Sequence, residues 1–66
     1  MKITDLRARL EETFGPAYAA SVANDQVLTQ LGGRTINQAL ASNFEVVAVW
    51  RAVVAAYPDR VPARIR

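Results

Sequence analysis

The chain has 66 residues, with eight lysines and arginines against six carboxylates, and it contains no cysteine and no histidine. A domain of this size buries only about 60% of the surface that its unfolded chain exposes, so its stability depends on dense packing. The missing residue types exclude disulfides, thiolate or imidazole metal sites and histidine-based catalysis. We therefore expect no enzyme activity, no cofactor, no metal and no small-molecule substrate.

No segment of the sequence has the pattern of a signal peptide or of a membrane span. Charged residues interrupt the first dozen positions, and no apolar run approaches the roughly 20 residues that cross a bilayer. We therefore expect a cytoplasmic protein that does not insert into membranes.

Two helices are predicted in the first half of the chain. Residues 4–14 follow the Thr4 cap with apolar positions at helical spacing. Gly15 and Pro16 interrupt this helix and can begin a second one, because proline is tolerated at the first helical position. The second helix is predicted over residues 16–31, before two glycines that suit a helix end. Its apolar positions are Tyr18, Val22, Ala23, Val27, Leu28 and Leu31.

Two further helices are predicted in the second half. Thr35 followed by Gln38 is a capping-box pattern that starts a short helix over residues 36–42, and Asn43 can end it in the left-handed conformation. A fourth helix is predicted over residues 45–57, before Pro58. Its core-facing stripe consists of Val46, Val49, Trp50, Val53, Val54 and Tyr57.

These elements predict an all-α fold, a small four-helix orthogonal bundle. We expect a single domain over residues 1–58 and a basic, mobile C-terminal tail over residues 59–66, because Pro58 and Pro62 frame that segment. The aromatic residues are expected in the core, although rings at such positions can also stack on bases. They are Phe14, Tyr18, Phe44, Trp50 and Tyr57.

The segment 35–54 resembles the helix-turn-helix of bacterial repressors such as the LacI family. Ala39 permits close approach of two helices, Asn43 suits the turn, and Val49 can lock the corner. The pattern predicts a helix-turn-helix-like corner between helices three and four. Because the second helix begins with Glu45, which repels phosphate, we interpret the corner first as structural and second as a nucleic-acid contact.

The loop Gly32–Thr35 allows two interpretations. Backbone N–H groups at the start of the third helix, beside Arg34, could hold an anion. The same residues also suit a helix C-cap followed by an N-cap. No Walker lysine follows, so nucleotide binding is not indicated.

The outer face of the predicted fourth helix is strongly apolar. A helix that is apolar on most sides is usually buried, so either the second helix wraps around it or the face meets a partner protein or a second copy of the chain. On the second interpretation, the contact residues are Val47, Ala48, Arg51, Ala52 and Ala55.

Motifs along nearly the whole chain form one pattern. They are Phe14–Ala19, Ser21–Ala23, Leu31–Thr35, Gln38–Ala41, Val49–Val53 and Val61–Arg64. This pattern resembles a family of short actinobacterial proteins classed as a domain of unknown function. Genes of that family often lie beside those for RecA and its regulator RecX, so the resemblance implies an association with DNA repair or recombination. The chain departs from the family over residues 43–48, where charge on the outer face of the fourth helix is lost.

The sequence therefore predicts an uncharacterised, non-enzymatic interaction module that binds a protein partner or a second copy of itself. The alternative is a small helix-turn-helix-like protein that binds nucleic acid. Its phosphate contacts would come from Arg34, Arg51, Arg60, Arg64 and Arg66.

Overall fold

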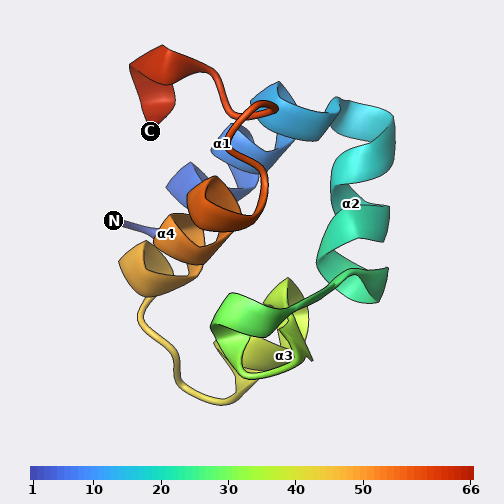
Figure 1. Ribbon diagram of the computed structural model, residues 1–66, viewed down its shortest axis with the longest axis vertical. Helices are drawn as coiled ribbons and strands as arrows, with labels where there is room; N and C mark the ends of the chain where they lie inside the picture. The colour runs from blue at the N-terminus through green and yellow to red at the C-terminus, as the bar shows by residue number, and fades with distance from the viewer.

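The computed structural model describes all 66 residues, and four α-helices make up most of the chain. These are α1 (Ile3–Phe14), α2 (Pro16–Asp25), α3 (Ile36–Ala41) and α4 (Val46–Ala56). Short elements complete the fold: β1 (Val27–Leu28), the 3₁₀ turn η1 (Thr29–Leu31), β2 (Arg34–Thr35) and the 3₁₀ turn η2 (Ala63–Ile65). In Figure 1, α1 and α4 lie at one side of the molecule, α2 descends along the other, and α3 lies at the far end. The fold is mostly helical, as predicted, but it includes a two-stranded sheet and is not strictly all-α. None of its helices has both the length and the hydropathy to cross a bilayer.

The junction between α1 and α2 depends on Gly15. Its φ of 86° and ψ of 152° belong to a region that glycine adopts without steric cost. Its N–H donates a hydrogen bond to the Glu11 carbonyl at 2.8 Å, which ends α1, and Pro16 begins α2. The chain reverses there, and α2 packs against α1 with Ala19 and Ala23 buried.

A small hairpin replaces the end of the predicted second helix. The sequence predicts that helix over residues 16–31, but α2 ends at Asp25. β1 and β2 pair antiparallel, with Val27 opposite Thr35. The turn η1 lies between the strands and is closed by Gly32, which has a left-handed φ of 68°.

The apolar residues at positions 27–31 have helical spacing although they do not lie in an α-helix. Leu28 and Leu31 are both buried, yet one reaches the core from a strand and the other from a 3₁₀ turn. Val27, predicted to face the core, is 60% exposed. Asn24 and Asp25 are weak helix formers and β-branched Val27 favours extended backbone, so local propensity ends the helix where periodicity would continue it.

The capping box and the left-handed turn predicted around α3 are both present. Thr35 Oγ1 accepts the Gln38 backbone N–H at 3.1 Å, and Gln38 Oε1 accepts the Thr35 N–H at 3.0 Å. Asn43 has a φ of 67°, and the chain turns there from α3 towards α4. Ala39 and Val49, predicted to lock this corner, are completely buried. α3 and α4 therefore contact each other at small and apolar side chains.

The core is one continuous cluster to which all four helices contribute. Its largest fully buried side chains are Leu6, Leu10, Leu31, Ile36, Val49 and Val53. Phe14 and Trp50 are buried beside them, as predicted. Tyr18 is the exception among the aromatic residues: it was expected in the core, but it is 70% exposed because it lies on the solvent side of α2.

The C-terminal segment, residues 59–66, was predicted to be a basic, mobile tail, but it packs against the helices. Val61 is only 3% exposed and belongs to the main core cluster. Trp50 Nε1 donates a hydrogen bond to the Ile65 carbonyl at 3.0 Å. Val61 and Ile65 give the segment an apolar side that packs on the core. The boundary expected at residue 58 therefore has no counterpart in the packing.

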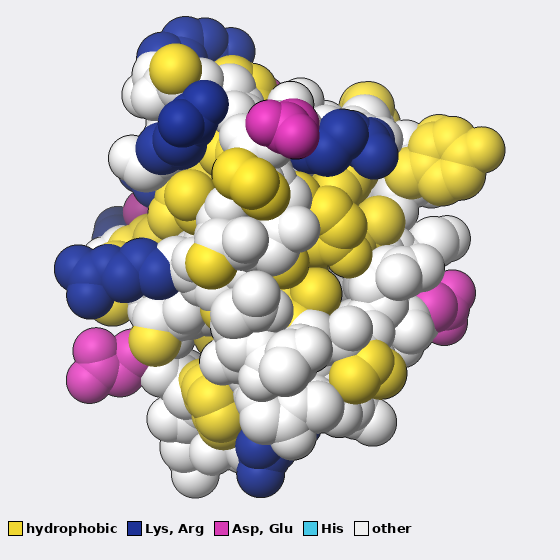
Figure 2. All heavy atoms as spheres, in the orientation of Figure 1, with side chains coloured by type: hydrophobic (Ala, Val, Ile, Leu, Met, Phe, Trp, Pro, Cys, Tyr) yellow, Lys and Arg dark blue, Asp and Glu magenta, His cyan; other side chains and the backbone are white.

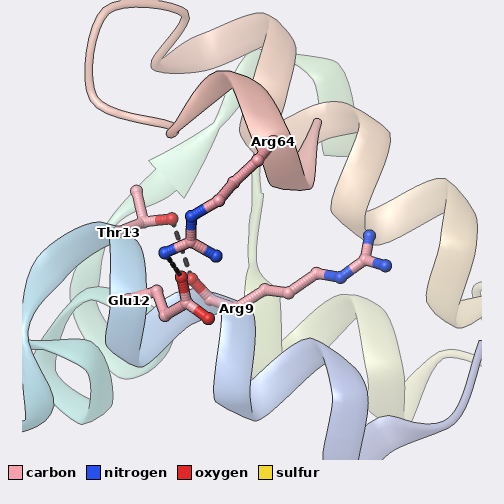
Figure 3. A network of polar contacts seen from close by, with 4 residues as sticks. All are labelled: Arg9, Glu12, Thr13 and Arg64. Atoms are coloured by element: carbon pink, nitrogen blue, oxygen red, sulfur yellow. Dashed lines mark hydrogen bonds and ion pairs between the residues drawn. The ribbon is translucent and has the colours of Figure 1, made fainter.

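Two arginines add polar contacts to this docking. The Arg9 guanidinium lies 5.5 Å from the centroid of a Trp50 ring and reaches the Ile65 carbonyl at 3.4 Å. Arg64 of η2 forms an ion pair with Glu12 of α1, and Figure 3 shows the two side chains pointing towards each other. An exposed pair of this kind contributes at most about 1 kcal/mol, so the buried contacts contribute more to the docking.

Candidate functional site

The outer face of α4 is only partly exposed. Ala48, Arg51 and Ala55 are exposed on one side of the helix, and Val47 is half-buried. Ala52 was predicted among the contact residues, but it is 6% exposed and belongs to the core cluster. The prediction is wrong for this residue.

The burial of Ala52 follows from helix geometry. Ala52 lies in one row with Val49, Val53 and Ala56, at the spacing that places side chains along one side of a helix. All four pack in or against the core, so α4 buries a wider face than the stripe predicted. The outer face that remains consists of Ala48, Arg51, Ala55 and half-buried Val47, which is a smaller apolar surface than the sequence predicts.

Two of the arginines predicted to contact phosphate have partners within the chain. The Arg34 guanidinium carbon lies 5.3 Å from the Phe44 ring centroid, and Arg34 donates a hydrogen bond to the Leu31 carbonyl at 3.1 Å. These contacts are within the chain, so they favour the capping interpretation of the loop Gly32–Thr35 over the anion-binding one. Arg64 is paired with Glu12. On the face drawn in Figure 2, the basic side chains lie at several separate places. The full predicted set is Arg34, Arg51, Arg60, Arg64 and Arg66.

A groove that the sequence did not reveal lies between α2 and the residues that follow α4. It has a volume of about 390 Å³. Figure 2 shows hydrophobic side chains gathered between α4 and α2, next to a basic side chain. We call this feature the aromatic groove, and its lining consists of Phe14, Tyr18, Val22, Gln26, Tyr57 and Arg60.

Aromatic rings make up half of the lining. Phe14, at 7% exposure, lies at the bottom, and its ring meets that of Tyr57 edge to face, with centroids 5.1 Å apart and planes at 84°. Tyr18 lies at the rim with 70% of its surface exposed. Half-buried Val22 adds aliphatic surface beside them. Four of the six lining residues are therefore hydrophobic, and three of these four are aromatic.

Arg60 is the only charged residue in the lining. Its guanidinium carbon lies 5.2 Å from the centroid of the Phe14 ring. Its backbone N–H donates to the Tyr57 carbonyl at 3.1 Å, in the turn that follows Pro58. That turn places Arg60 over Phe14 of α1. Arg60 takes no part in the only ion pair of the chain, which joins Arg64 to Glu12.

Two features make the aromatic groove hard to predict from the sequence. Tyr18 shares helical spacing with buried residues, so its position predicts a place in the core. Arg60 lies in a segment predicted to be mobile, whereas docking of Val61 places it against Phe14. The only sequence signal for this arrangement is Arg60 next to apolar Val61, between Pro58 and Pro62. That signal does not indicate that Arg60 contacts the Phe14 ring.

The helices and the aromatic groove both lie within the part of the chain that a family model covers. The model described as "Protein of unknown function (DUF3046)" matches residues 1–64. No curated protein and no solved structure matches the chain.

Proposed function

Because the chain belongs to the DUF3046 family of proteins of unknown function, we propose its role from its own surface: a non-enzymatic interaction module that holds a segment of a partner protein in the aromatic groove. One observation carries the proposal. Tyr18 is 70% exposed at the rim of a hollow whose other walls are Phe14, Val22 and Tyr57. Exposed apolar surface concentrated in a concave site is typical of places where proteins bind partners.

The size and composition of the aromatic groove suit one large side chain of a peptide. Its volume of about 390 Å³ is at the small end of ligand sites, and only six residues line it. Six residues cannot enclose a small substrate on all sides, whereas a side chain that projects from a peptide needs cover mainly at its end. Aromatic residues are enriched among the residues that dominate binding energies, because they bury large areas with few rotatable bonds.

The first prediction concerns Tyr18. Random peptides displayed on phage are selected on the immobilised protein, and the affinity of a selected peptide is measured by fluorescence anisotropy. We expect Tyr18→Ala to weaken binding by at least about tenfold, because an exposed ring covered by a ligand behaves as a hot spot. Circular dichroism should show an unchanged fold, since Tyr18 is exposed.

The matched control is Ala48→Glu on the outer face of α4, which should leave the affinity unchanged. Helix geometry places Ala48 on the opposite side of α4 from Tyr57, so it lies away from the aromatic groove. If no peptide is selected, or if peptides tolerate Tyr18→Ala but are lost with Ala48→Glu, the proposed site is wrong. The second result would favour the outer face of α4 that the sequence predicts.

The setting of this binding is a finer part of the proposal. We place the module in the cytoplasm of an actinobacterium, near the machinery of DNA repair or recombination. This setting is supported by the gene neighbourhood that the sequence resemblance implies, and it is an association, not a mechanism. The aromatic groove does not depend on it.

The alternative function, nucleic-acid binding, is favoured by the corner between α3 and α4, where Arg51 is exposed. Glu45 before α4 and the pairing of Arg64 with Glu12 act against phosphate binding. We therefore expect no binding of single- or double-stranded DNA at micromolar protein and about 50 mM salt. A complex that weakens steeply with salt and is lost with Arg51→Gln would establish the alternative instead.

A further inference from the structure

The charge of the aromatic groove indicates the chemistry of the segment that it holds. We infer that this segment carries an Asp or Glu carboxylate beside a large apolar side chain, so that Arg60 binds the carboxylate while the apolar side chain enters the groove. This inference rests on the proposed function and adds the class of partner.

Arg60 is held in place with its donor groups free. Its guanidinium carbon lies over the Phe14 ring, 5.2 Å from the centroid. A guanidinium carries five N–H donors, more than one contact with a ring can occupy. Arg60 takes no part in the chain's single ion pair, Arg64–Glu12. Arg60 is exposed and its side chain makes no ion pair within the chain, so its donors are left to solvent.

Comparison with the other stacked arginines shows that Arg60 differs from them. Arg9 lies over Trp50 and donates to the Ile65 carbonyl at 3.4 Å. Arg34 lies over Phe44 and donates to the Leu31 carbonyl at 3.1 Å. Arg60 has the ring but no such acceptor. A ligand that covers the groove can supply an acceptor that the chain itself does not.

The lining of the aromatic groove contains no negatively charged partner for Arg60. None of its residues carries a carboxylate, and its other polar member, Gln26, is neutral. An entirely apolar segment would cover Arg60 without giving it an acceptor, which costs the desolvation of a charged group. A carboxylate removes that cost through charge-assisted, two-pronged hydrogen bonds. We favour a carboxylate over a nucleic-acid phosphate because a single arginine beside aliphatic and aromatic walls does not extend along a charged backbone.

A charge-swap experiment tests the inference. The probes are a peptide selected on the protein that contains an Asp or Glu, and the same peptide with that residue changed to Asn or Gln. We expect the amide peptide to bind the wild-type protein about tenfold more weakly. Arg60→Gln should weaken the acidic peptide by a similar factor and leave the amide peptide unchanged. Arg60→Glu should bind the peptide in which the carboxylate is replaced by Lys.

Arg51→Gln is the matched control, because Arg51 is an exposed arginine that lies outside the aromatic groove, and it should not alter either affinity. Peptides that need Tyr18 but show no preference for an acid and no dependence on Arg60 would overturn the inference and leave the proposed function standing. Peptides that do not depend on Tyr18 would overturn the proposed function itself. Displacement of the acidic peptide by single-stranded DNA, abolished by Arg60→Gln, would identify phosphate as the anion and also overturn the inference.

Discussion

Replacement of Trp50 by alanine is expected to lower the free energy of unfolding by about 3–5 kcal/mol, as is usual when a buried Trp or Phe is reduced to Ala. Trp50 is 3% exposed within the core cluster, and its Nε1 donates to the Ile65 carbonyl at 3.0 Å. The loss combines a cavity, the hydrogen bond and the ring on which Arg9 stacks. A domain of this size has roughly 3–10 kcal/mol in total, so urea denaturation followed by circular dichroism should show a partly unfolded variant.

Trp50→Phe separates packing from hydrogen bonding. It keeps an aromatic ring in the core but removes the N–H donor to the Ile65 carbonyl, so we expect a smaller loss of about 1–2 kcal/mol. Equal losses in the two variants would show that the hydrogen bond, and not the ring, dominates. A Trp50→Ala protein with the urea midpoint of the wild type would contradict the burial of this residue.

Val61→Asp is the second large effect that we expect, with a loss of about 3–5 kcal/mol in the free energy of unfolding. The estimate adds the transfer free energy of a buried valine to the cost of burying a polar group without a partner. Val61 is 3% exposed, so a carboxylate at this position has to enter the core or pull residues 59–66 away from it. Thermal denaturation measures the loss.

Ala63→Asp is its control, since it adds the same charge two residues later at an exposed position of η2. It should change the free energy of unfolding by no more than about 0.5 kcal/mol, as is usual for surface substitutions. Two variants of equal stability would mean that residues 59–66 form the mobile tail that the sequence predicts. The structure makes Val61 part of the core instead, and it also makes the position of Arg60 depend on Val61.

The parts of the fold that follow from local chemistry were predictable. Gly15 with Pro16 indicates the break between α1 and α2, and the Thr35–Gln38 pair and Asn43 indicate the start and end of α3. Each signal acts over a few residues of backbone. The same holds for α4, whose stripe of valines and Trp50 has an unambiguous helical period.

The parts that depend on distant contacts were not predictable. The β1–β2 pairing joins Val27 to Thr35, and no hairpin motif in the sequence announces it. Helical spacing misassigned Tyr18 to the core and Ala52 to the surface, because periodicity gives the faces of a helix but not which neighbours cover them. The aromatic groove depends on two such features. Tyr18 of α2 has to be exposed, and the segment after Pro58 has to fold back over Phe14.

The central claim is that the aromatic groove is where this protein binds its partner. The most direct measurement is an NMR titration of the isotope-labelled protein with an acidic peptide selected on it. We expect the largest chemical-shift changes at the groove residues Tyr18, Val22, Gln26, Tyr57 and Arg60. No changes are expected on the outer face of α4, at Ala48, Arg51 and Ala55. Changes confined to that outer face, with the groove residues unaffected, would contradict it.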